Sequence, residues 1–130
     1  MDHNQILVDT SILIEHLRKK RKDQTTFFKA TNQYECYISS VTEFEFAVGT
    51  TEQNRVFVKQ LLAQLPVLPF DSVCAQTAAE IYQTLKSKNQ LISVPDIFIV
   101  ATALAHDIPL QTLNVKHFAR VEQLQLNIVS

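Results

Sequence analysis

The stretch Ile6–Ile14 reads ILVDTSILI: an apolar run, one acid and two hydroxyls, and then a second apolar run. The first run is short enough for a buried strand, whereas the second continues with the spacing of a helix. Asp9, Thr10 and Ser11 are polar residues of the kind that start helices. The stretch therefore predicts a strand that leads directly into a helix, with Asp9 at the junction.

The same alternation of strand and helix continues along the rest of the chain. The predicted strands are Gln5–Val8, Cys36–Ile38, Val67–Phe70, Leu110–Leu113 and Leu126–Val129. The predicted helices cover 10–17, about 24–32, 40–49, Glu52–Gln64, about 71–88 and 95–105. Strands that alternate with helices form parallel sheets covered on both faces, so the fold class is α/β, a three-layer α/β/α domain with a central parallel sheet. We expect one domain over residues 1–130, because 130 residues bury one core but not two.

Composition excludes several classes of enzyme. The only glycine is Gly49, whereas a P-loop or a dinucleotide fingerprint needs several glycines at fixed spacing. The four histidines lack the H-x-x-x-H spacing of a zinc hydrolase, and no G-x-S-x-G elbow indicates a serine hydrolase. Cys36 and Cys74 are isolated in apolar surroundings, which predicts two buried thiols rather than a disulfide or a zinc site.

The chain also lacks signals for the membrane or for export. It has no apolar run of about 18 residues that would span a bilayer. Its first residues, MDHNQILVDT, lack the basic start and the longer apolar stretch of a secretory signal. We therefore expect a cytoplasmic protein with no membrane partner.

Five consecutive cations, Arg18–Lys22, stand out in a chain whose net charge is −1. One interpretation is a solvated helix end whose cations complement the helix dipole. The other is a patch that binds phosphates or an acidic partner. The block by itself does not distinguish them.

Three acids lie where apolar segments meet their turns, and each has a structural alternative. Asp9 follows a strand and is either a helix cap or a ligand at the sheet edge where ligands gather. Asp96 follows Pro95 at a helix start and either complements the dipole or binds a ligand. On the helix that contains VTEFEFAVG, the apolar direction predicted from Val41, Phe44 and Val48 places Glu45 at the edge of the core and Glu43 in solvent.

Four motifs in order make the chain resemble the PIN-domain ribonucleases and, within them, the VapC toxins of type II toxin–antitoxin pairs. They are VDTSILI, ISSVTEFEFAVG, PDIFIVATAL and PLQTLNVKHF, and together they span nearly the whole length. The resemblance implies a PIN-like fold and an endoribonuclease that hydrolyses RNA phosphodiester bonds with Mg²⁺ or Mn²⁺. It also implies a homodimer and a VapB-type antitoxin whose tail blocks the site.

The resemblance also implies the roles of individual residues. Asp9, Glu45 and Asp96 correspond to the acids that bind the metal and catalyse the reaction, and Asn114 takes the place where a fourth acid often stands. The hydroxyls of Thr10, Ser11, Thr42 and Thr112 correspond to supporting residues. An asparagine carries no charge, so we expect weaker binding of a second metal.

Two rival interpretations remain open at this stage. Asn114 is consistent with a PIN-like scaffold or RNA-binding module that has lost effective chemistry. A DTS sequence after a strand is also a weak sign of a metal-dependent phosphatase with another α/β fold, which would form a phosphoaspartate at Asp9.

Overall fold

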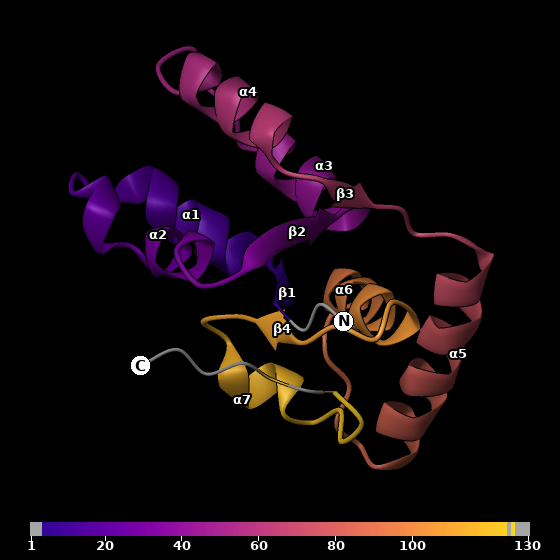
Figure 1. Ribbon diagram of the computed structural model, residues 1–130. Helices are drawn as coiled ribbons and strands as arrows, with labels where there is room; N and C mark the ends of the chain where they lie inside the picture. The colour runs from indigo at the N-terminus through magenta and orange to yellow at the C-terminus, as the bar shows by residue number, and fades with distance from the viewer. Residues whose placement is uncertain (1–3, 125, 127–130) are drawn as a thin grey trace.

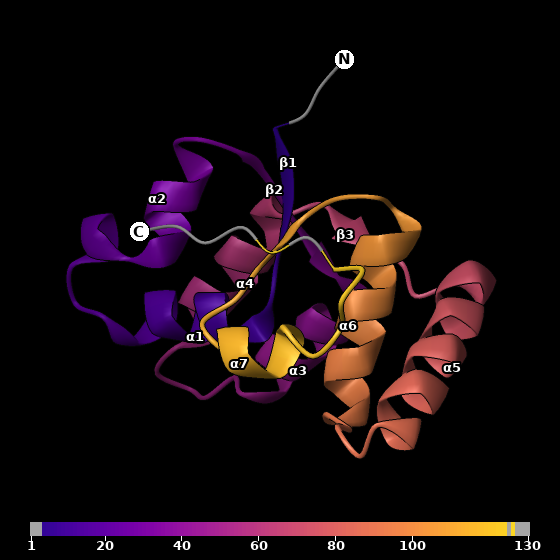
Figure 2. The ribbon, with the colours of Figure 1, turned by 90° about the horizontal axis from the view of Figure 1, so that it is seen from below.

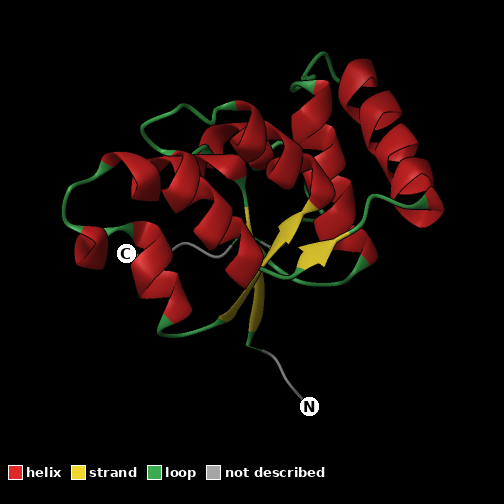
Figure 3. Cartoon of the chain, turned by 90° about the horizontal axis from the view of Figure 1, so that it is seen from above, coloured by secondary structure: helices red, strands yellow, loops and turns green. Residues whose placement is uncertain are grey.

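The structure is a computed structural model that describes residues 4–124 and 126. Its strands are β1 (Gln5–Val8), β2 (Glu35–Ser39), β3 (Val67–Leu68) and β4 (Leu110–Gln111). Its helices are α1 (Thr10–Arg18), α2 (Thr26–Thr31), α3 (Ser40–Val48), α4 (Arg55–Gln64), α5 (Ser72–Ser87), α6 (Val94–Ala105) and α7 (Val115–Phe118), with a 3-10 turn, η1, at Lys22–Gln24. Each predicted strand that falls within the described residues is present, although β3 and β4 are shorter than predicted (Figure 3).

The four strands form one parallel sheet in the order β3-β2-β1-β4 (Figure 1). The central strand β1 pairs with β2 through Ile6 and Cys36, and with β4 through Val8 and Gln111. An isolated parallel bridge joins Leu110 to Leu126. The rest of the predicted strand Leu126–Val129 lies outside the described residues. The parallel α/β/α prediction is confirmed.

Alternate side chains of β1 enter two separate cores, which is why the sheet needs helices on both faces. Leu7 packs in a cluster with side chains of α5, α6 and α7. Ile6 and Val8 pack in a second cluster with side chains of α1, α2, α3 and α4. Figure 1 shows α5 and α6 on one side of the strands and α1, α2 and α4 on the other.

Five helices begin at a side chain that accepts a hydrogen bond from the backbone N–H three residues ahead, which satisfies one of the free donors of the first turn. These N-caps are Asp9, Thr25, Ser39, Asp71 and Ser93. The predicted end of α3 at Gly49 is confirmed, with an ordinary φ of −78°. Asn89 has φ 56°, a left-handed conformation that asparagine tolerates, in the turn after α5.

The predicted apolar direction of α3 is wrong. Phe44 and Val48 are each 67% exposed, whereas Thr42 is fully buried and Phe46 is 3% exposed. The inward face of α3 therefore runs through Thr42 and Phe46. Phe46 packs in the buried cluster that also contains side chains of α1 and β1. Glu45 is half-buried and Glu43 is exposed, as predicted, because Glu45 lies closer to the true inward direction.

Cys36 and Cys74 are buried free thiols, which confirms the prediction, and burial raises the pKa of Cys36 to about 11. None of the helices in the described part of the chain has the length and apolarity that a bilayer crossing requires.

Candidate active site

The predicted acids are positioned at one edge of the sheet, where the strands end and the following helices begin. Figure 2 shows α1, α3 and α7 gathered at the carboxyl end of β1, with the loop between α5 and α6 at the same end. Asp9 directly follows β1, Glu45 lies on α3 directly after β2, and Asp96 lies in the first turn of α6. This is the edge at which open α/β sheets bind ligands.

Asp9 is the most buried of these acids, with 3% of its surface exposed. Its Oδ1 accepts hydrogen bonds from Ser11 Oγ at 2.5 Å and from Ile12 N at 3.4 Å, and its Oδ2 accepts one from Thr112 Oγ1 at 2.5 Å. Burial raises the pKa of Asp9, the three hydrogen bonds oppose that change, and the nearby charge of Asp96 raises the pKa further. Asp9 is therefore both the predicted cap of α1 and a buried acid close to a second carboxylate.

The loop from β4 to α7 is attached to Asp9 through hydroxyl groups. Thr112 Oγ1 accepts a hydrogen bond from Asn114 N at 2.9 Å, in addition to its bond to Asp9. Ser11 Oγ accepts one from Leu113 N at 3.0 Å and lies 3.5 Å from Thr112 Oγ1. The side chain of Asn114 is exposed and makes no cap hydrogen bond to α7, so the structure leaves it at the rim of the site.

Glu45 is connected to the start of α1 by a second set of hydroxyls. Thr10 Oγ1 donates to Glu45 Oε1 at 2.6 Å and lies 3.2 Å from Thr42 Oγ1. Thr42 is fully buried, which makes the base of this contact rigid. Because Thr10 adjoins Asp9 in the sequence, the same turn of chain positions two of the three acids.

Asp96 is half-buried and is the third residue of α6. Its backbone N–H donates to Ser93 Oγ at 3.3 Å. Its position in the first turn, which the sequence predicted, is favourable for a negative charge because of the helix dipole. Its charge acts on Asp9, so the two carboxylates belong to one electrostatic environment.

The side chains offer oxygen donors of the kind that a hard divalent cation prefers. Among the described residues, no three His, Cys, Asp or Glu side chains form a ready-made metal-binding group. Mg²⁺ does not need one, because it keeps several waters and is commonly held by one or two carboxylates together with substrate phosphate. Asp9 and Asp96 fit that requirement. Glu45 accepts a hydrogen bond from the hydroxyl of Thr10, which adjoins Asp9 in the sequence.

The five cations of the block Arg18–Lys22 differ in their contacts, so the block is not one continuous patch of unpaired charges. Lys22 Nζ donates to the carbonyl oxygens of His16, Leu17 and Lys19 at 2.7–2.8 Å and lies 4.8 Å from the ring centroid of Phe57. It closes the end of α1, as the helix-end interpretation predicted. Arg18, Lys19, Lys20 and Arg21 are all exposed, and two of them have acidic neighbours: Glu15 lies 3.8 Å from Lys19 and Asp23 lies 3.2 Å from Arg21.

Comparison with known proteins agrees with this geometry. The family model described as PIN domain matches residues 6–124, and the chain belongs to the PIN domain family. It is 31% identical to ribonuclease VapC1 of Methanocaldococcus jannaschii over 98% of this chain and 88% of that protein. It is also 35% identical to ribonuclease VapC10 of Mycobacterium tuberculosis over 92% of this chain and 90% of that protein.

Solved structures with the same fold come from toxin–antitoxin complexes. The DNA-bound VapBC of Salmonella typhimurium contains a chain that matches with a TM-score of 0.83 and 23% identity, covering 95% of this chain and 96% of that one. The VapBC-1 structure of nontypeable Haemophilus influenzae contains one with a TM-score of 0.81 and 25% identity, with the same coverage. The identification of the PIN family from the four motifs is confirmed.

Sequence reasoning missed the contacts of two cations. Lys22 was not separated from the other cations of its block, and Arg120 was not singled out at all. Both donate to backbone carbonyls, Lys22 at the end of the helix that precedes it and Arg120 in the loop between α5 and α6. A pattern of residue types does not reveal such contacts, because every residue has a carbonyl and only the fold decides which one a cation reaches.

Proposed function

We propose that this protein is a metal-dependent endoribonuclease that hydrolyses RNA phosphodiester bonds with Mg²⁺ or Mn²⁺. The observation that carries the proposal is the buried Asp9, hydrogen-bonded through both oxygens and close to the charge of Asp96, at the carboxyl edge of the sheet. A buried carboxylate whose pKa is raised by the charge of a second carboxylate is stabilised when a cation lies between the two. The similarity to proteins named ribonuclease supports RNA as the substrate.

The roles of the side chains follow from their contacts. Asp9 and Asp96 would hold the cation. A bound divalent cation would supply Lewis acidity, offsetting charge on the phosphate and lowering the pKa of a water. Thr10 engages Oε1 of Glu45, so we assign to the other oxygen, Oε2, the role of orienting the attacking water and accepting its proton. The water oxygen then bonds to phosphorus while the bond from phosphorus to the leaving ribose oxygen breaks, and that oxygen takes a proton from solvent water to leave as a hydroxyl.

We also propose that an antitoxin protein controls this activity in the cytoplasm and that the nuclease works as a homodimer. The support for a partner comes from the similarity to chains solved in VapBC complexes.

The net charge of the chain is −1, so the protein as a whole does not attract RNA. The cations near the end of α1 would attract it locally.

The test is RNA cleavage by purified, antitoxin-free protein with Mn²⁺, beside Asp9→Asn and Glu45→Gln. We expect cleavage by the wild type and a loss of at least about 100-fold in each variant, because Asp9→Asn removes a charged metal ligand and Glu45→Gln removes the proposed general base. If wild type and variants bind RNA equally and none cleaves it, the alternative of an RNA-binding scaffold replaces the nuclease. A covalent phosphate on Asp9 would instead indicate the phosphatase interpretation.

A further inference from the structure

The loop between α5 and α6 decides where α6 starts and hence where Asp96 lies. It turns through Asn89, whose φ of 56° redirects the chain. Asn89 N donates to Lys86 O at 3.1 Å, and Gln90 N donates to Leu85 O at 2.8 Å, which closes α5. The next residues lead to Ser93, whose hydroxyl caps α6 at Asp96 N. A shift of this loop would move the first turn of α6.

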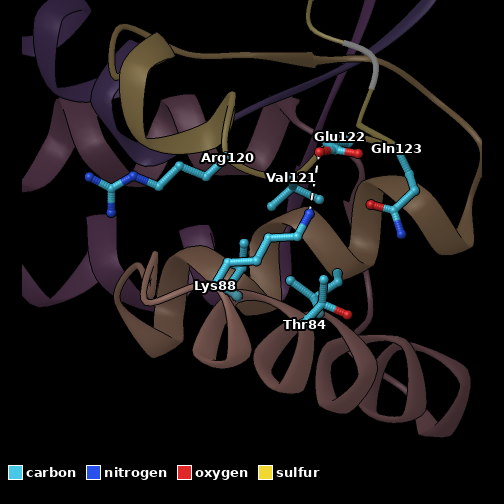
Figure 4. A pocket seen from close by; sticks show the side chains of 8 residues that line it. Thr84, Lys88, Arg120, Val121, Glu122 and Gln123 are labelled. Carbon is cyan, nitrogen blue, oxygen red and sulfur yellow. Dashed lines mark hydrogen bonds and ion pairs between the residues drawn. The ribbon is translucent and has the colours of Figure 1, made fainter.

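Arg120 holds this loop from another part of the chain. Its Nη1 donates to Leu91 O at 3.0 Å and lies 3.5 Å from Gln90 O. Figure 4 shows a different contact beside it, the ion pair between Lys88 and Glu122, while the Arg120 side chain extends away from that pair. These side chains line a pocket of about 240 Å³ between the end of α5 and the turn after α7.

The segment that contains Arg120 begins at Thr112, beside Asp9. Thr112 bonds to Asp9 Oδ2, α7 follows, and Phe118 anchors the segment in the same buried cluster as Leu85 and Ile97. Residues 112–120 therefore extend from the carboxylate of Asp9 to the loop that starts the helix of Asp96. Both ends of this short segment are attached by hydrogen bonds, and its middle is fixed by burial.

We infer that Arg120 is a positioning residue: by holding the carbonyls of Leu91 and Gln90, it sets the placement of Asp96 relative to Asp9. A guanidinium donates stronger hydrogen bonds than a neutral group, and its planar geometry restricts the position of the acceptor. The Lys88–Glu122 pair joins the same two segments but does not reach the loop carbonyls, to which Arg120 donates directly.

The test compares three variants by hydrogen exchange of the metal-free protein. Arg120→Met keeps the aliphatic stem and removes the donor, Arg120→Lys restores one donor, and Glu122→Gln breaks only the neighbouring ion pair. We expect the amides of Asp96 and Ile97 to exchange about tenfold faster in Arg120→Met, with protection largely restored in Arg120→Lys and unchanged in Glu122→Gln. Unchanged exchange in Arg120→Met, or an equal effect of Glu122→Gln, would overturn the inference.

A second measurement, which rests on the proposed function, is Mn²⁺ affinity by calorimetric titration. We expect Arg120→Met to weaken binding about tenfold, as loss of an outer contact to a ligand does, with cleavage recovering at high Mn²⁺. A wild type that binds no Mn²⁺ would contradict the proposed function, whereas the exchange result would still decide the role of Arg120. Wild-type affinity in Arg120→Met would contradict the positioning role alone.

Discussion

Thr112 Oγ1 lies 2.5 Å from Oδ2 of Asp9, although 103 residues separate them in the chain. The bond joins the residue that follows β1 to the residue that follows β4, at the edge where these two paired strands leave the sheet. Its donor stabilises the charged form of a carboxylate that burial otherwise disfavours. The balance between these two effects gives the site several measurable properties.

Replacing Thr112 with valine removes this hydrogen bond while keeping the shape of the side chain. Because the bond lowers the pKa of Asp9, the variant should have an Asp9 pKa raised further above its ordinary value. A metal ligand must be deprotonated, so activity with Mn²⁺ should fail at a higher pH on acidification than in the wild type. We expect cleavage at neutral pH to drop about tenfold. The measurement is the pH dependence of kcat/KM.

Thr112→Ser is the matched control for this experiment, because it keeps the hydroxyl. Its acid limb should coincide with that of the wild type. A Thr112→Val profile that also coincides would mean that the hydroxyl does not tune Asp9.

Asp9→Asn should stabilise the protein when no metal is present. A carboxyl whose pKa is raised on folding opposes folding above its folded-state pKa, and this cost disappears once pH falls below the unfolded-state value. At neutral pH the neutral amide escapes the cost, so we expect Tm to rise by about 3 °C. Thermal melts with and without Mn²⁺ provide the measurement. The wild type should gain stability from millimolar Mn²⁺ and the variant should not.

Thr10→Val should separate the orientation of Glu45 from its presence. The variant loses the 2.6 Å contact to Glu45 Oε1 but retains the acid and the buried Thr42. If Glu45 acts on water, kcat should fall about tenfold, while Mn²⁺ affinity stays close to that of the wild type. Steady-state kinetics beside a Mn²⁺ titration measures both. Thr10→Ser serves as the control, and equal kcat in all three proteins would remove Thr10 from the mechanism.

Asn114→Asp should strengthen metal binding. Asn114 is exposed at the N-cap of α7 and is connected through its backbone N–H to Thr112, which contacts Asp9. A carboxylate there adds charge at the rim and complements the start of the helix. We expect Mn²⁺ to bind about fivefold more tightly, by calorimetry, with RNA affinity in EDTA reduced or unchanged. Equal Mn²⁺ affinity would place residue 114 outside the metal site.

Lys22→Met should destabilise the fold, whereas Lys20→Gln should not. Lys22 Nζ donates to three backbone carbonyls at the end of α1, and removing it leaves these acceptors to solvent. We expect a loss of about 1–2 kcal/mol in the free energy of unfolding, measured by urea denaturation. Lys20 is exposed, so its substitution should leave stability intact and reduce the salt dependence of RNA binding if the block meets RNA.

Much of the fold could be predicted because it depends on local chemistry. The apolar run before Asp9 and the hydroxyls after it specify a strand, a cap and a helix within ten residues. Pro95 and Asp96 likewise define a helix start, which lies one residue earlier in the structure than predicted. The inward face of α3 could not be predicted in the same way, since Phe44 and Val48 are apolar and yet exposed. Which face of the helix is buried depends on how the helix packs against neighbouring elements in the folded chain.

The residue types of the candidate site were evident from the sequence, because an acid beside buried positions is costly and therefore conspicuous. The tertiary structure decided how these acids are connected: Asp9 to Thr112, Glu45 to Thr10, and the loop before α6 to Arg120. Each contact joins segments that are distant in the chain, and the sequence does not show which hydroxyl reaches which acid. Local propensity determines the elements, whereas contacts between elements depend on packing, which only the folded chain establishes.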